Sequence, residues 1–180
     1  MPQAELPEAL RDQICRSTVA LSLATAEQDD MPLCLANSAF CSLTGYGADE
    51  VHGRNCRFLQ TPDTPPEQVR AMSLFLQSDD RDDGRFPVLN RTRQGRMFTN
   101  LVFMSKLRGM DGCVRFVIAS QFNISAANRA ATQPAHDGKL ARNVSDLRVA
   151  AAQFGLIMTD SSALLARSIS TLARITVRDE

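Results

Sequence analysis

The chain has 180 residues, 44% of them hydrophobic, which is enough for one globular domain with a core and short appendages. Its 20 basic and 20 acidic side chains cancel, which excludes a strong overall attraction to nucleic acid or anionic lipid. Five scattered cysteines without a CxxC pair argue against a disulfide framework and a zinc site. No stretch approaches the ~20 apolar residues of a membrane span and no secretory signal is evident, so we expect a cytoplasmic protein without membrane contact.

The N-terminal part predicts a helix followed by the start of a sheet. Leucine and isoleucine recur at four-residue spacing in residues 5–18, which indicates a helix whose apolar stripe must cover a surface. The next residues predict a β-hairpin, with strands over 19–25 and 33–37 on either side of a polar turn over 27–32. An antiparallel sheet therefore begins here.

Helical segments are expected in the middle of the chain. Asn37 or Ser38 can cap a short helix that ends at Gly45, and another short helical turn ends at Gly53. After a proline-rich turn, residues 67–77 carry apolar side chains at helical spacing and predict the longest helix of the core. Short helices after a hairpin are typical of an α+β domain.

Three further strands are expected over 86–93, 97–108 and 113–125, after a polar run at 78–85 that we interpret as a solvated connection. The last strand has apolar residues on both faces, as expected for a strand that lines a ligand pocket. The element order β-β-α-α-α-β-β-β predicts an α+β fold with a five-stranded antiparallel sheet and short helices on one face, which is the pattern of PAS domains.

The composition changes to Ala, Asn, Gln, Pro and Gly beyond residue 125, which is typical of a linker. Two amphipathic helices joined near Thr159 are expected after it. We therefore divide the chain into an N-terminal helical cap (1–18), a core (19–125), a linker (126–138) and a C-terminal helical extension (139–180).

The segment GRNCRFLQ at residues 53–60 resembles the cysteine-bearing signature of LOV (light-oxygen-voltage) domains, which are flavin-binding blue-light photoreceptors of the PAS type. The resemblance covers roughly residues 20–125. It implies that the sulfur of Cys56 adds to the C4a position of the flavin after blue-light excitation, and that the adduct breaks in the dark. It also implies a short LOV protein that is not an enzyme and has no fused effector domain.

Several carboxamide side chains fit such a ligand on chemical grounds. The edge of the flavin ring offers carbonyl acceptors and N–H donors, and Asn and Gln both donate and accept. A buried carboxamide without a partner costs ~1–3 kcal/mol, so several of them on interior faces imply a polar ligand or a water network. The candidates are Asn55, Gln60, Asn90, Asn100 and Gln121.

The resemblance assigns particular roles to some polar residues. Gln121 would relay the signal, because protonation of flavin N5 turns an acceptor into a donor and the amide can answer by rotating. Arg57 would bind the flavin phosphate with its planar fork of donors. Ser73 stands where many members carry a second phosphate-binding arginine, with Arg70 three residues earlier. Arg57 makes FMN the expected cofactor, whereas Ser73 leaves riboflavin and FAD open.

Apolar candidates for the same pocket follow from the resemblance. Two of them replace phenylalanines that often line the ring in the family, so the wall is expected to be looser and the adduct lifetime altered. Those two are Val102 and Val117, and the other apolar candidates are Leu59, Val69, Val88 and Leu101.

Other features favour ordinary structural roles. The remaining cysteines are expected to pack as small hydrophobic residues. His52 and His136 are isolated from each other and from carboxylate-rich motifs, so we expect neither a metal site nor acid–base chemistry. Those remaining cysteines are Cys15, Cys34, Cys41 and Cys113.

We expect signalling through helix docking or through a homodimer formed by the N- and C-terminal helices, with light-dependent affinity and an unknown downstream protein. A light-independent PAS-type flavin redox sensor is one alternative. A helix-turn-helix DNA-binding regulator, with its turn near Thr159, is another. Arginines decorate the C-terminal helices, but interspersed acidic residues dilute them, so nucleic-acid binding is disfavoured.

Overall fold

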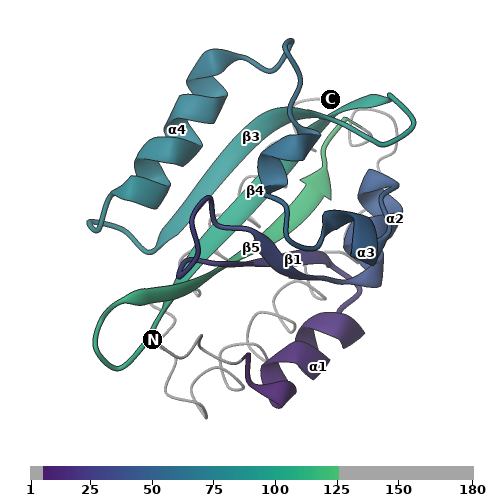
Figure 1. Cartoon of the computed structure of the whole chain (residues 1–180). Coiled ribbons are helices and arrows are strands. Elements are labelled where there is room, and N and C mark those ends of the chain that lie inside the picture. Colours follow the sequence, from purple (N-terminus) through teal and green to yellow (C-terminus); the bar gives the residue numbers. More distant parts are fainter. Residues whose placement is uncertain (1–5, 126–180) are drawn as a thin grey trace, which may run out of the picture.

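The structure is a computed structural model of the chain, and it describes residues 6–125. Five strands form one sheet in the order β2-β1-β5-β4-β3, and every neighbouring pair is antiparallel. The predicted five-stranded α+β fold is confirmed (Figure 1). The strands are β1 (Ala20–Thr25), β2 (Leu33–Ala36), β3 (Asp83–Arg91), β4 (Met97–Arg108) and β5 (Val114–Asn123).

The helices between β2 and β3 are α2 (Ser38–Thr44), α3 (Ala48–Val51), a single 3-10 turn η1 (Cys56–Leu59) and α4 (Pro66–Gln77). Asn37 caps α2, because its side-chain oxygen accepts a hydrogen bond from the Phe40 N–H at 2.9 Å. Gly45 ends the helix in the left-handed conformation with φ of 80°. In Figure 1, α4 runs along β3, and α2 and α3 lie beside β1. These helices lie over one face of the sheet.

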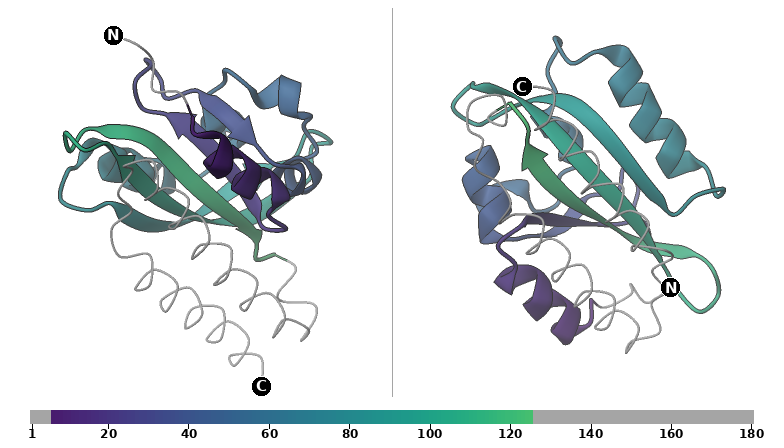
Figure 2. Two further views of the ribbon diagram at one scale, coloured as in Figure 1. Left: turned by 90° about the horizontal axis from the view of Figure 1, so that it is seen from below. Right: turned by 180° about the vertical axis from the view of Figure 1, so that it is seen from behind.

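The predicted N-terminal helix is present as α1 (Glu8–Arg16). Leu10 and Ile14 are fully buried in a cluster with outward-facing residues of β1, β4 and β5, among them Leu23, Leu107 and Phe116. The views in Figure 2 show α1 apart from the other helices. The sheet therefore covers the apolar stripe of α1.

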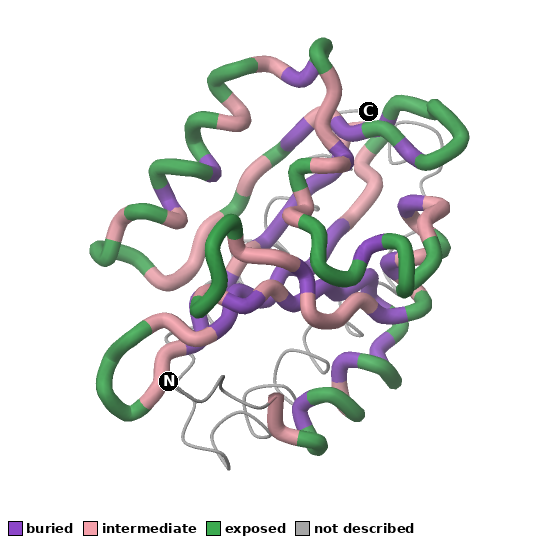
Figure 3. Tube along the Cα trace, in the orientation of Figure 1, coloured by how far each residue is buried: buried purple, intermediate pink, exposed green. Residues whose placement is uncertain are grey.

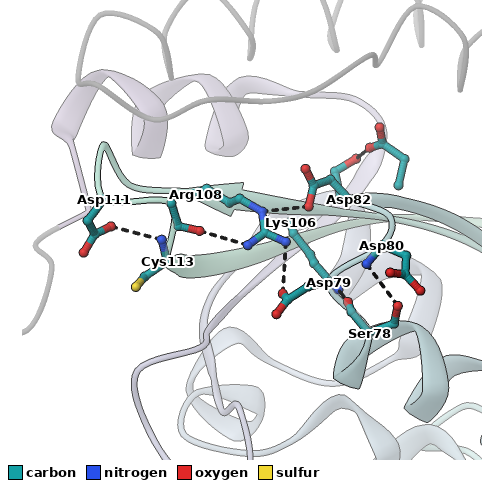
Figure 4. A network of polar contacts seen from close by, with 11 residues as sticks. Ser78, Asp79, Asp80, Asp82, Lys106, Arg108, Asp111 and Cys113 are labelled. Atoms are coloured by element: carbon teal, nitrogen blue, oxygen red, sulfur yellow. Dashed lines mark hydrogen bonds and ion pairs between the residues drawn. The ribbon is translucent and has the colours of Figure 1, made fainter.

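The far end of α4 is tied to β4 by a polar network (Figure 4). Arg108 forms ion pairs with Asp79 at 3.2 Å and with Asp82 at 2.8 Å. The ammonium of Lys106 donates a hydrogen bond to the carbonyl of Ser78, the residue that ends the helix, and lies 4.7 Å from the centre of the Phe75 ring. Burial lowers the pKa of Lys106. Figure 3 shows buried and exposed residues alternating along α4, as expected for a helix with one covered face.

The start of β3 differs from the prediction. Residues 83–85 were expected in a solvated connection, but Asp83 and Gly84 pair with Ser105 and Met104 of β4. The side chain of Asp83 accepts a hydrogen bond from the Ser105 hydroxyl at 2.5 Å. Because β3 is an edge strand, it tolerates polar residues, and it also tolerates Pro87.

The predicted linker (126–138), the C-terminal helices (139–180), His136 and the suggested helix-turn-helix near Thr159 lie outside the described residues. Within residues 6–125, no helix combines the length and apolar character that a membrane span requires. In the same range, no group of three or more His, Cys, Asp or Glu side chains could hold a metal ion.

Candidate functional site

A cavity lies between the inner face of the sheet and the segment that runs from η1 to α4. About 140 Å³ of it is available to the centre of a water molecule. One water needs roughly 10–15 Å³ by this measure, so the cavity is too large to be a packing defect. Its lining includes most of the predicted site residues, namely Asn55, Cys56, Arg57, Gln60, Val69, Ser73, Val88, Asn90, Asn100, Val102, Val117 and Gln121.

The strand register explains which strand residues face the cavity. Side chains alternate between the two faces of a strand, so Asn100 and Val102 of β4 point to the same side. Their partners across the ladder are Val88 of β3 and Gln121 of β5, which also line the cavity. Leu101 was expected to contact the ligand as well, but it falls between two inward residues and is buried away from the cavity lining. Leu101 thus does not line the cavity, and its contact with a ligand stays a prediction.

Leu59 is likewise absent from the lining, and its contact with a ligand stays a prediction. Leu59 is the last residue of η1 and is 1% exposed, but it packs into a cluster with Leu33, Phe40 and Val51 instead of lining the cavity. It anchors the 3-10 turn to α2, α3 and β2. The turn in consequence holds its first residue, Cys56, at the cavity.

Two carboxamides in the cavity have unpaired buried oxygens. Gln121 donates a hydrogen bond to the Ser22 hydroxyl at 2.9 Å, and Asn100 donates one to the side-chain oxygen of Asn90 at 3.0 Å. The other ends, Oε1 of Gln121 and Oδ1 of Asn100, are buried and have no partner. Because an unpaired buried polar atom is costly, these oxygens require a donor inside the cavity. A ligand with N–H groups or an ordered water can provide it.

Asn37 shows what a structural carboxamide looks like in the same fold. Its side-chain oxygen accepts from the N–H of Leu21 at 3.0 Å as well as from Phe40, and its nitrogen donates to the carbonyl of Val19 at 2.7 Å. This residue is 2% exposed and satisfied at both ends. The unpaired oxygens of Asn100 and Gln121 are therefore a property of the cavity and not of buried carboxamides in general.

Cys56 contributes an uncharged thiol to the cavity. Its residue is only half-buried, but desolvation around the sulfur raises the pKa of the thiol to about 12. The thiol is therefore protonated across the physiological pH range. Such a group is a poor nucleophile by itself, since the thiolate is the reactive form. Chemistry at Cys56 therefore needs an activating partner in the cavity.

Arg57 is the one charged residue that lines the cavity in the part of the chain that the structure describes. Its guanidinium forms an ion pair with Asp30 at 2.5 Å, and both side chains are more than half exposed. Asp30 belongs to the loop between β1 and β2, where Met31 also lines the cavity. The structure thus brings this loop to the mouth of the cavity, next to η1. Ser73 of α4 lines the cavity, whereas Arg70 is not among the lining residues.

Sequence reasoning missed several residues that line the cavity. Met104 and Ala119 follow from the register, because they lie two residues from Val102 and Gln121 on the same strands. Others follow from helical spacing on α4, which repeats every three to four residues. The missed residues are Ser22, Ala24, Met31, Leu33, Met72, Leu76, Met104 and Ala119.

The other cysteines that were expected to be structural lie elsewhere. Cys34 donates a hydrogen bond from its thiol to the carbonyl of Leu23 at 3.4 Å, and burial raises the pKa of its thiol. Cys41 lies on α2 and is half-buried, and Cys15 and Cys113 are exposed. None of the four is among the residues that line the cavity.

A model of the PAS domain matches residues 22–126. A LOV domain from an Erythrobacter litoralis blue-light activated histidine kinase is 32% identical, with a TM-score of 0.57 over 61% of this chain and 98% of that one. The chain is a LOV domain of the PAS family. The LOV protein of Rhodobacter sphaeroides is 28% identical, with a TM-score of 0.71. That match covers 95% of this LOV chain and 96% of the Rhodobacter protein.

Blue-light-activated histidine kinase 1 of Erythrobacter litoralis is 36% identical over 113 residues, which are 61% of this chain. The match covers 30% of that kinase, so this chain corresponds to a minor part of its length. Residues 53–60, which suggested the LOV family, lie inside the matched PAS range.

Proposed function

We propose that this LOV domain is a blue-light receptor in which Cys56 is the reactive thiol and a flavin is the chromophore. The observation that carries the proposal is that one cavity collects an uncharged cysteine thiol and two carboxamides with unpaired buried oxygens. These groups fit the donors and acceptors of a flavin ring edge. The names of the kinases and LOV proteins that match the chain support light as the input.

A bound flavin would supply absorption of blue light and an excited ring able to take the sulfur of a neutral thiol at C4a and its hydrogen at N5. The chain contributes the position and the protonation state of that thiol. η1 holds Cys56 at the cavity through the buried Leu59, and desolvation keeps its proton on sulfur. A neutral thiol is unreactive in the dark, which makes the response depend on light.

Gln121 is the proposed relay to the rest of the molecule. Gln121 lines the cavity, its side-chain oxygen is buried without a partner, and its nitrogen donates to Ser22 of β1. In this orientation the amide oxygen suits a donor such as a protonated flavin N5, whereas an unprotonated N5 is an acceptor and would require the amide to rotate and give up its bond to Ser22. A change in the protonation of N5 would therefore change the orientation of the amide. Because β1 and β5 are neighbours and α1 packs on their outer face, loss or formation of the Gln121–Ser22 bond would alter the contact between the sheet and α1. The proposed output is altered helix docking or assembly of a homodimer.

The apolar stripe of α1 is already covered by the sheet, so a homodimer that uses this helix must contact its exposed side. A light-independent flavin redox sensor is the second candidate. It is favoured by the same unpaired carboxamides, which would hold a flavin whether or not Cys56 reacts. The two candidates differ in what they require of the thiol.

The test is an absorption spectrum of the full chain with bound flavin in the dark, under blue light and during recovery. Wild type should lose its blue flavin band reversibly, and Cys56→Ala should bind flavin but keep the band under light. Cys34→Ala is the matched control, because it removes a half-buried thiol outside the cavity and should behave as wild type. Reversible bleaching that persists in Cys56→Ala would contradict the proposal and favour the redox sensor.

A further inference from the structure

The entrance of the cavity carries a balanced pair of charges. Among the lining residues within 6–125, Arg57 alone is charged, so an anionic end of a ligand would be drawn to it. Its guanidinium is already held by the carboxylate of Asp30 at 2.5 Å. A ligand anion that approaches Arg57 therefore meets a competing anion at the same site.

The backbone of the loop is shaped to present Asp30 in this place. Asp30 and Met31 have φ angles of 68° and 46°, and two consecutive non-glycine residues in the left-handed region are unusual. Such backbone strain persists where surrounding contacts enforce it. Asn55 supplies one of these contacts, because its nitrogen donates to the carbonyl of Asp30. Its oxygen accepts from the N–H of Arg57 at 2.9 Å and so caps η1.

One asparagine thus fixes both sides of the ion pair, the loop that bears Asp30 and the turn that bears Arg57. Met31, the next residue of the same loop, lines the cavity. The pair therefore joins two segments at the cavity that are 27 residues apart in the sequence. A group that displaces Asp30 from Arg57 also acts on the loop that covers this end of the cavity.

We propose that Asp30 is a specificity-determining residue that lowers the preference of the cavity for a phosphate-bearing flavin over an uncharged one. The inference rests on the proposed flavin-binding function. A terminal phosphate must break the Asp30–Arg57 pair and then lie beside the released carboxylate, whereas the hydroxyl end of riboflavin can leave the pair intact. Asp30 therefore discriminates between flavins by the end of their side chain and not by their ring.

The experiment is a titration of the flavin-free full chain with FMN and, separately, with riboflavin, followed by flavin fluorescence. Compared with wild type, Asp30→Asn should bind FMN about fivefold more tightly, as expected for an exposed ion pair worth up to ~1 kcal/mol, and should bind riboflavin unchanged. The gain for FMN should shrink at high ionic strength, because both side chains are more than half exposed. Arg57→Gln should remove the difference in binding affinity between FMN and riboflavin.

Asp29→Asn is the matched control. It makes the same charge change one residue away, in a side chain that is exposed and outside the pair, and should leave the FMN to riboflavin ratio near that of wild type. An equal effect of Asp29→Asn and Asp30→Asn, or an Asp30→Asn effect that is the same for both flavins, would overturn the inference while flavin binding itself stands. Failure of wild type to bind either flavin would overturn the proposed function and the inference together.

Discussion

The two faces of the sheet are filled in opposite ways. The outer face packs against α1 through aliphatic and aromatic side chains, with Leu10, Ile14 and Leu107 fully buried. The inner face is lined by amides, hydroxyls and apolar residues around a cavity, and two of its amide oxygens have no partner. Residues that alternate along the same strands serve these two environments.

This difference indicates that the outer face stabilises the fold and that the inner face binds a ligand. Close packing of apolar groups is the main favourable term in folding, so the outer face is expected to carry stability without any cofactor. The inner face has buried polar groups that are satisfied only when something occupies the cavity. Three experiments test this division, in order of decreasing expected effect.

The largest effect is expected from Ile14→Ala on the outer face. The side chain is fully buried between α1 and the sheet, so its loss should lower the free energy of unfolding by about 2–5 kcal/mol, with or without flavin. Urea denaturation followed by circular dichroism measures this change. The control is Asp12→Ala on the exposed side of the same helix, where the change should stay within about 0.5 kcal/mol. A small effect of Ile14→Ala would mean that α1 is not part of the stable core.

A smaller and ligand-dependent effect is expected from Gln121→Leu on the inner face. The substitution loses one hydrogen bond to Ser22 and also removes a buried unpaired oxygen, so flavin-free stability should change by no more than about 1 kcal/mol. The increase in melting temperature on adding flavin should be smaller than in wild type, because a ligand contact is lost. Strong destabilisation of the flavin-free protein would contradict the proposed division between the faces.

The smallest effect is a difference in alkaline stability caused by Cys56. Its thiol has a pKa raised to about 12 in the folded protein from 9.0, so the folded state keeps a proton that the unfolded chain releases. The stabilisation is complete below about pH 9 and is lost as the pH rises toward 12, with a slope of at most about 1.4 kcal/mol per pH unit. Flavin-free wild type should therefore lose more stability than Cys56→Ala between pH 8 and pH 9.5 in urea denaturation, by up to about 0.8 kcal/mol. Parallel losses in the two proteins would mean that the thiol is not desolvated.

Much of the fold could be predicted because its signals are local. Alternating strands, the Asn37 cap and the left-handed Gly45 depend on residues close in sequence, and the structure has each of them. The exception at the start of β3 arose because Asp83 and Gly84 join the sheet through their partner strand. Their own composition is that of a connection. Pairing across a ladder is a long-range contact that local composition does not report.

The candidate site could be predicted only in part for the same reason. Asn100, Leu101 and Val102 were all named, although three consecutive residues of a strand cannot face one side. Leu59 lies three residues from Cys56 but is drawn into the core by Phe40 and Val51, which come from other elements. The ion pair between Asp30 and Arg57 had no signal in the sequence, since the loop reaches Arg57 only after the hairpin and η1 have formed.

The sequence by itself determined the class of fold, the family and the position of the thiol. Periodic patterns, caps and the GRNCRFLQ segment each depend on residues that are close together in the sequence. Only the tertiary structure decided which carboxamides stay unpaired, how strongly burial raises the pKa of Cys56, and which acid stands beside Arg57. These properties depend on desolvation and on contacts between distant segments. They exist only after the sheet and its helices have closed around the cavity.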